Sequence, residues 1–190
     1  KMLINGPESF TPDDRFLLGE SPELRGFFLG CGMCSVGIAS GGGAGQALAE
    51  WIIDGEPSMD LWSVDIRRFV PAQNTLRTLR ERSPETLSLH YAVSFPGRQH
   101  KSSRNLRLSP LHSRLESAGA EFTERMGWER PRWFNPERRK IDPELSFEKT
   151  GWHSIHAEEH RSARESVVLF DQSTFGKLLV QGRDAESVLQ

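Results

Sequence analysis

The sequence predicts a mixed fold, α+β or α/β, in which short strands alternate with helices. An apolar run at Phe27–Leu29 leads into a glycine-punctuated turn and then a helix, which is typical of a strand–turn–helix unit. Gly55 and Pro57 mark the end of that helix, since glycine favours the left-handed C′ position and proline cannot continue a helix. Further strands are predicted at 17–18, 120–125, 167–170 and 175–180.

The composition is that of an ordinary globular protein. The chain has 190 residues, of which 36% are hydrophobic and 26% charged, and its net charge is −2. This balance argues against a disordered chain and against a nucleic-acid partner. No run of about 20 apolar residues predicts a membrane span. The chain starts without a signal or transit peptide pattern and stops as a helix begins, so we expect an internal segment of a longer protein.

The helix after the turn is unusually rich in glycine. Gly41, Gly42, Gly43 and Gly45 fall within five residues, and each interior helical glycine costs about 1 kcal/mol relative to alanine. We therefore expect close approach, because without Cβ atoms another backbone or a flat ligand can lie against this face.

The turn itself combines a strand end, glycines and a helix N-terminus, which together favour negative charge. A dinucleotide fingerprint would need a third glycine, and Ser35 stands in its place, so this is not the pyrophosphate loop. The residues alone leave two interpretations open: contact with another part of a cofactor, or tight packing without a ligand.

Two cysteines, Cys31 and Cys34, form a single CxxC. A redox pair or half of a metal site is one interpretation, and two small residues in a packed turn is the other. No second CxxC exists, and the intervening Gly32-Met33 is unlike a thioredoxin-type site, so the packed turn is favoured, in a reducing compartment.

The middle of the chain predicts connecting helices. One is expected over 72–82, and Ser83-Pro84 predicts a new start because serine caps and proline suits the first helical position. Ser109-Pro110 repeats this signal before a helix that ends at Gly119. Between them lies a basic loop that could attract anions through Arg98, His100, Lys101, Arg104 and Arg107.

Two aromatic or histidine-rich stretches follow. The tryptophans of residues 128–134 are expected to anchor a loop on the core, with a stacking platform for a pterin as the alternative. His153, His156 and His160 fall on one face of a predicted helix, where an interface is favoured over a metal site. Asp184 is the expected N-cap of the last helix.

Long stretches of the chain resemble a known family. The first set resembles the end of the flavin domain of the sarcosine and dimethylglycine dehydrogenase family, and it comprises NGPESFTPDDRFLLGE, GFFLGCGMCSVGIASGGGAGQALAEWIIDG and DLWSVDIRRF. The second set resembles the start of its folate-binding, aminomethyltransferase-like domain, and it comprises GWERPRWF and LFDQSTFGKLLVQGRDAESVLQ. The resemblance implies three parts: 1–57 from the flavin domain, a helical linker at 58–108, and 109–190 from the second domain.

The resemblance also implies a function. The complete enzyme would oxidise sarcosine or dimethylglycine with FAD, pass electrons to an acceptor, and transfer the one-carbon unit to tetrahydrofolate, in the mitochondrial matrix or a bacterial cytoplasm. The isolated chain is expected to be inactive, with most of the folate site outside it. A regulatory protein resembling the pyruvate dehydrogenase phosphatase regulatory subunit is the alternative. Glu8 is expected to face the substrate, and the flavin is expected to contact Gly32, Met33, Cys34, Ser35, Val36, Gly37 and Ile38.

Overall fold

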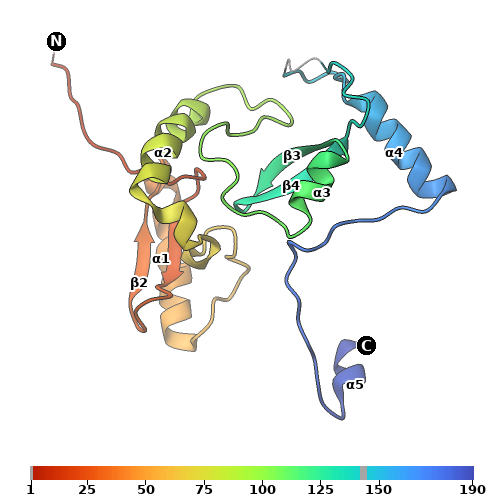
Figure 1. Cartoon of the computed structure of the whole chain (residues 1–190). Coiled ribbons are helices and arrows are strands. Elements are labelled where there is room, and N and C mark those ends of the chain that lie inside the picture. Colours follow the sequence, from red (N-terminus) through yellow and green to blue (C-terminus); the bar gives the residue numbers. More distant parts are fainter. Residues whose placement is uncertain (1, 142–144) are drawn as a thin grey trace.

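The computed structural model describes residues 2–141 and 145–190 and confirms the mixed fold (Figure 1). It contains helices and two separate antiparallel sheets of two strands each. In chain order the elements are β1 (Leu17–Glu20), β2 (Phe28–Cys31), α1 (Gly37–Asp54), the 3₁₀ helices η1 (Ile66–Arg68) and η2 (Pro71–Asn74), α2 (Leu76–His90), α3 (His112–Ser117), β3 (Ala120–Arg125), β4 (Trp128–Phe134), α4 (His153–Glu165) and α5 (Ala185–Leu189).

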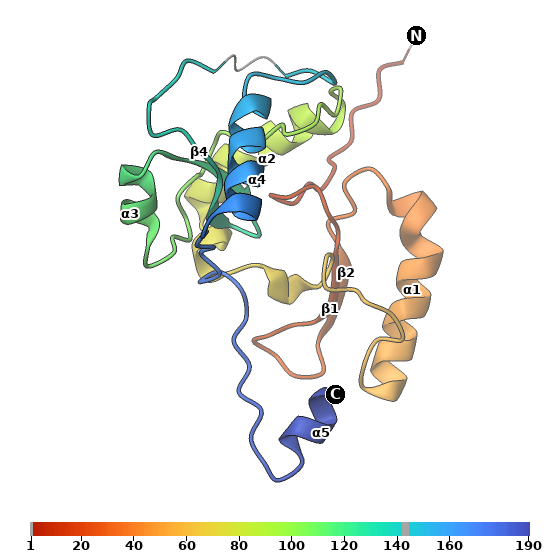
Figure 2. The ribbon, with the colours of Figure 1, turned by 90° about the vertical axis from the view of Figure 1, so that its right-hand side faces the viewer.

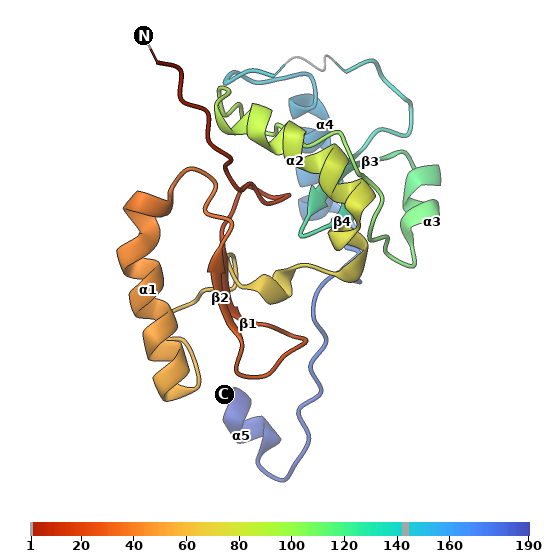
Figure 3. The ribbon, with the colours of Figure 1, turned by 90° about the vertical axis from the view of Figure 1, so that its left-hand side faces the viewer.

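The first unit consists of β1, β2 and α1. The strands pair antiparallel, and α1 lies along one face of this small sheet (Figures 2 and 3). Ala44, Ala47 and Trp51 recur at helical spacing and are buried, so they form the packed stripe of α1. Gly19 lies opposite Trp51: a Cβ there would come within 2.6 Å of the indole, and its φ is +108°. Only glycine fits this contact without strain.

The end of α1 confirms the sequence prediction, and its glycine face lies against no other backbone of the described residues, so close approach of a ligand there stays a prediction. Gly55 adopts a left-handed conformation, and its N–H donates to the Trp51 carbonyl at 2.9 Å. The glycines at 41, 42, 43 and 45 were expected to lie against another backbone or a ligand. Within the described parts of the chain, a Cβ at any of the four would meet no heavy atom within 4 Å. This face of α1 is therefore open.

The linker helix α2 contradicts the predicted break at Ser83-Pro84, because a single helix runs through Pro84. Thr75 caps its start by accepting from the Thr78 N–H at 3.2 Å. Long-range contacts hold the helix on both sides of the proline. Arg82 donates to the Ser102 carbonyl at 2.6 Å, and buried Thr86 donates to the Pro12 carbonyl at 3.0 Å. Tertiary contacts thus override the local signal.

The β3–β4 hairpin confirms the strand predicted at 120–125, whereas residues 128–134 differ from their prediction. Residues 128–134 form β4 rather than a loop, paired with β3 from Arg125↔Trp128 to Ala120↔Phe134. Met126 and Gly127 have φ of +53° and +76°, as a two-residue type I′ turn requires. Methionine is an unusual first residue for such a turn, so the sequence predicts this turn only weakly. The helix predicted after Ser109 begins at His112, and Gly119 follows it with φ +88°.

The C-terminal region also differs from its prediction. Residues 167–170 and 175–180 form no strand in the described structure, and from Ser166 to α5 the chain is irregular, with a turn in which the Phe175 N–H donates to the Gln172 carbonyl at 3.0 Å (Figures 1 and 3). Val167 and Leu178 are almost fully exposed, so no neighbouring strand supplies the hydrogen bonds that a sheet needs. Asp184 does precede α5, but its side chain makes no capping hydrogen bond.

Candidate functional site

The predicted cofactor residues form the turn that carries β2 into α1. Gly32, Cys34 and Ser35 all have positive φ, at +63°, +46° and +66°. Glycine is required at 32, because a Cβ there would lie 2.8 Å from the methyl group of Thr11. The left-handed residues Cys34 and Ser35 turn the chain back so that the helix can begin at Gly37. The seven predicted residues are therefore one continuous local structure.

The helix end at this turn has no side-chain cap. Val36 occupies the N-cap position and makes no side-chain hydrogen bond, while Ile38 in the first turn is fully exposed. The first N–H groups of a helix have no partner within the helix, and they carry the positive end of its dipole. The first turn of α1 therefore offers donors and partial positive charge to an electron-rich group.

Cys34 ties the turn to the N-terminal segment. Its thiol is buried and donates to the Gly32 carbonyl at 3.1 Å, and its N–H donates to the Ser9 carbonyl at 3.1 Å. The backbone N–H of Thr11 lies 3.5 Å from the same sulfur. Cys31 is exposed, and both thiols are free. These contacts support the packed-turn interpretation of the CxxC.

Glu8 lies next to the contact between the N-terminal segment and the turn. It is exposed and immediately precedes Ser9, whose carbonyl accepts the hydrogen bond from Cys34. The structure thus brings the segment of Glu8 beside the turn, although the two are more than twenty residues apart in the sequence. The substrate-facing role of Glu8 stays a prediction.

The C-terminal end of α2 also meets the turn, a contact that the sequence did not predict. The hydroxyls of Tyr91 and Ser35 are hydrogen-bonded at 2.8 Å. Next to it, His90 Nδ1 lies 2.9 Å from both carboxylate oxygens of Asp14. Tyr91 is the single tyrosine of the chain, which is the one signal that could have drawn attention to it.

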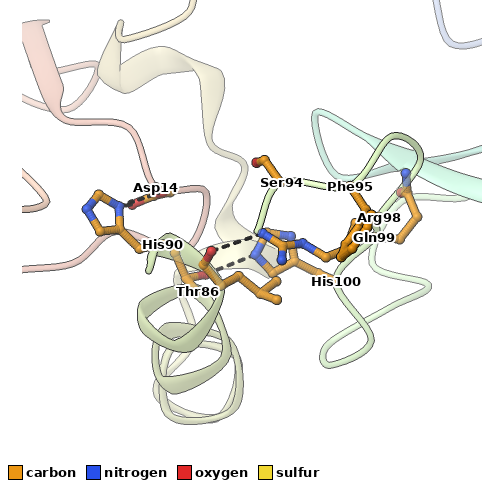
Figure 4. A pocket seen from close by; sticks show the side chains of 9 residues that line it. Asp14, Thr86, His90, Ser94, Phe95, Arg98, Gln99 and His100 are labelled. Atoms are coloured by element: carbon orange, nitrogen blue, oxygen red, sulfur yellow. Dashed lines mark hydrogen bonds and ion pairs between the residues drawn. The ribbon is translucent and has the colours of Figure 1, made fainter. Parts of the chain in front are cut away.

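A pocket of about 240 Å³ opens beside this contact, between α2 and the loop that follows it (Figure 4). Its polar groups are largely engaged with one another. The Thr86 hydroxyl donates to Pro12, so it accepts from His100 Nε2 at 3.1 Å. Burial, together with the nearby charge of Arg82, lowers the pKa of His100. Arg98 donates to the carbonyls of Leu89 and Val93. The hydrogen bonds at this pocket therefore mainly connect α2 to the segments that pack against it.

Most polar and charged groups of the predicted basic loop bind other residues of the chain. The Arg104 guanidinium pairs with the buried carboxylate of Glu129, with Nε 2.7 Å from Oε1. The backbone N–H groups of Lys101 and Ser102 donate to Glu85. Arg107 is different, because its guanidinium lies 4.2 Å over the Trp128 ring and forms no ion pair with the described residues.

Of the three histidines of α4, His156 contacts the hairpin, whereas His153 and His160 are exposed. His156 Nε2 donates to the Arg132 carbonyl at 3.2 Å, and the rings of Trp133 and Trp152 stack at 5.8 Å. In the described portion of the chain no cluster of histidine, cysteine or acidic residues could hold a metal ion. No helix there is long and apolar enough to cross a membrane.

Comparison with protein families identifies two consecutive domains. The family described as FAD dependent oxidoreductase central domain matches residues 54–109, and the GCVT N-terminal domain matches residues 111–190. The chain thus carries the junction of these two domains. These two matches agree with the resemblance to the sarcosine and dimethylglycine dehydrogenase family that the sequence predicted. The predicted limits of the three parts stay predictions.

Individual relatives match along nearly the whole chain. Mitochondrial sarcosine dehydrogenase of Mus musculus is 41% identical over 97% of this chain. The 4-methylaminobutanoate oxidase (formaldehyde-forming) of Paenarthrobacter nicotinovorans is 43% identical over 99% of it. The mitochondrial pyruvate dehydrogenase phosphatase regulatory subunit of Mus musculus is 38% identical over 98%. The chain spans less than a quarter of the length of each: 23%, 23% and 22%.

Proposed function

We propose that this chain is the junction segment of a flavin-dependent dehydrogenase that oxidises an N-methylated amino acid, such as sarcosine or dimethylglycine, and passes the one-carbon unit to tetrahydrofolate. The observation that carries the proposal is the 41–43% identity to sarcosine dehydrogenase and 4-methylaminobutanoate oxidase across both matched domains. The GCVT N-terminal match supports the folate step.

The turn at Gly32–Ile38 fits a flavin. Its helix end is uncapped, Ile38 is exposed, and the adjacent glycine face of α1 leaves room for a flat group or its extended chain. FAD, when bound, supplies the two-electron oxidation that no amino-acid side chain provides. The residues of this chain would hold the ring edge with backbone N–H groups and favour negative charge on it through the helix dipole.

Glu8 is the residue of this chain proposed to face the substrate. An N-methylated amino acid carries a cationic amine, which a carboxylate binds by charge-assisted hydrogen bonding. The Ser9–Cys34 hydrogen bond holds the Glu8 segment beside the turn, so ring and amine would be positioned by one connected piece of backbone. The electron acceptor and the folate site would be provided by other parts of the whole protein.

A non-catalytic regulatory role is the second candidate, because the pyruvate dehydrogenase phosphatase regulatory subunit is 38% identical over 98% of the chain. The absorption spectrum of the whole protein separates the two. We expect a flavin band in the visible blue that bleaches when sarcosine, dimethylglycine or 4-methylaminobutanoate is added without oxygen. A protein with no flavin band, or one that no N-methylated amino acid bleaches, would overturn the dehydrogenase proposal.

The relatives also support a location. The sarcosine and dimethylglycine dehydrogenases among them are named as mitochondrial, and the oxidase comes from a bacterium. We place the whole protein in the mitochondrial matrix or in a bacterial cytoplasm, in keeping with two free thiols.

A further inference from the structure

A second pocket, of about 270 Å³, lies where the linker meets the β3–β4 hairpin and the irregular segment after α4. We call it the arginine pocket. It is lined by Arg107, Arg125, Met126, Trp128, Arg130, Thr174 and Phe175.

Acidic and basic side chains of the hairpin lie on opposite faces. Glu124 and Glu129 are paired across the strands and therefore share one face, where each meets an arginine of the linker region, Arg82 and Arg104 respectively. Arg125 is paired with Trp128, and Arg130 stands two residues further along β4, so these side chains share the opposite face. The carboxylates thus lie on one side of the hairpin and the pocket arginines on the other.

Arg107 joins this second face through the backbone. The Glu129 N–H donates to the Arg107 carbonyl at 2.9 Å, and Arg107 forms an isolated parallel bridge with Trp128. Its guanidinium stacks on the Trp128 ring and donates to the Met126 carbonyl at 3.2 Å. Three arginines therefore line one pocket, and a tight turn and a strand pairing position them.

No carboxylate among the described residues balances these three charges. Across residues 2–141 and 145–190, none of the three arginines forms an ion pair with Asp or Glu. Burial lowers the pKa of Arg107, yet a guanidinium does not lose its proton in a protein. Arg107 and Arg130 stack on the rings of Trp128 and Phe175, and neither contact neutralises their charge, so the pocket can accept an anion from outside. Guanidinium groups bind carboxylate and phosphate oxygens through paired N–H donors, so an oxyanion matches the lining.

We infer that the arginine pocket binds a small oxyanion bearing two or more carboxylate or phosphate groups. Its volume suits a ligand smaller than a typical drug, and the Thr174 hydroxyl adds a neutral donor. Arg107 belongs to the first matched domain and the other lining residues to the second, so the bound anion would bridge the two. This inference does not depend on the proposed flavin chemistry.

The test is a calorimetric titration of the chain with pyrophosphate and, separately, with citrate, at ionic strength held constant with sodium chloride. We expect saturable binding to one site by at least one of them, and the preferred anion tells whether phosphate or carboxylate is the natural group. Absence of saturation by both anions at millimolar concentration would overturn the inference.

Variants show whether the pocket is responsible. The Arg125 side chain is exposed and forms no hydrogen bond or ion pair with the described residues, so Arg125→Gln should leave the fold intact. It should weaken binding by about tenfold or more, as the loss of a charge-assisted hydrogen bond predicts. Arg80→Gln on α2 changes the net charge equally, away from the pocket, and should leave affinity nearly unchanged. Equal weakening by both variants, or none by Arg125→Gln, would overturn the assignment. Arg130→Gln, checked by circular dichroism, repeats the test from β4.

Discussion

The β1–β2–α1 unit and the junction between the linker and the β3–β4 hairpin are stabilised by different forces. In the first unit the buried side chains are apolar, with Leu18, Ala44, Ala47 and Trp51 packed between helix and sheet. In the junction the buried side chains are polar or charged: Arg82 pairs with Glu124 at 2.6 Å, and Arg104 pairs with the fully buried Glu129.

This difference bears on what each region contributes. Apolar burial is non-directional and supplies stability, about 25 cal/mol per Å². Buried ion pairs recover little net free energy beyond their desolvation cost, but they tolerate only one geometry. We infer that the first unit provides stability near the turn, whereas the ion pairs fix the orientation of the hairpin on the linker.

The largest expected effect is the loss of the apolar core. Trp51→Ala should lower the free energy of unfolding by about 4 kcal/mol, because it removes the largest buried side chain of α1 and leaves a cavity against Gly19. Urea denaturation followed by circular dichroism measures this. Ile53→Ala, on the exposed side of the same helix, is the control, and an equal loss from it would contradict the packing described for α1.

Breaking one junction pair should cost somewhat less, about 3 kcal/mol. Glu129→Gln removes the charge that compensates Arg104 and leaves that guanidinium without its partner. Glu116→Gln, on the exposed surface of α3, should change the stability little. If the two variants unfold at the same urea concentration, the pair does not stabilise the junction.

The pH dependence of the stability also tests the pairing of Arg104 with Glu129. Burial alone would raise the pKa of Glu129, but hydrogen bonds from Arg104 and the Asn105 N–H, together with the Arg104 charge, outweigh it and lower the pKa. A carboxyl whose pKa is lower in the folded state stabilises above its unfolded pKa and loses that contribution as pH falls through the folded value. The stability gap between wild type and Glu129→Gln should therefore be constant above about pH 5 and shrink below about pH 4. A gap that widens on acidification would contradict this.

A smaller effect of opposite sign is expected on the open face of α1. Gly42→Ala should raise the stability of the isolated chain by about 1 kcal/mol, because the added methyl meets no atom and alanine favours the helix. Gly19→Ala is the contrasting variant and should destabilise, since its Cβ would clash with Trp51. If Gly42→Ala also lowers the flavin content of the whole protein, a ligand covers this face. A destabilised Gly42→Ala chain would show that the face is not open.

The same contrast explains what the sequence could predict. The helix ending at Gly55 and the strand at 120–125 follow from local residue chemistry, and both are confirmed. The run of α2 through Pro84 depends on Arg82 and Thr86, whose partners lie far away in the chain. The strands expected at 167–180 lack a neighbouring strand in the described structure, and apolar character alone does not form a sheet.

The parts of the candidate site also differ in whether the sequence predicts them. The turn at Gly32–Ile38 is predictable because glycines and a helix start lie together in the sequence. The Tyr91–Ser35 and Asp14–His90 contacts join segments more than fifty residues apart, and no spacing rule reveals them. The arginine pocket is an intermediate case: the basic loop signalled Arg107, but only strand pairing places Arg125 and Arg130 beside it.

The most direct test of the flavin placement is the midpoint potential of flavin in the whole protein carrying Ser35→Asp. Ser35 has a left-handed backbone, which aspartate and asparagine both tolerate, so Ser35→Asn is the matched neutral control. A carboxylate beside the uncapped helix end would offset a dipole contribution of about 0.3–2 kcal/mol. Since about 1.4 kcal/mol corresponds to roughly 30 mV for a two-electron couple, we predict a potential lower by tens of millivolts than in Ser35→Asn. An equal or higher potential in Ser35→Asp would contradict the placement of the flavin at this turn.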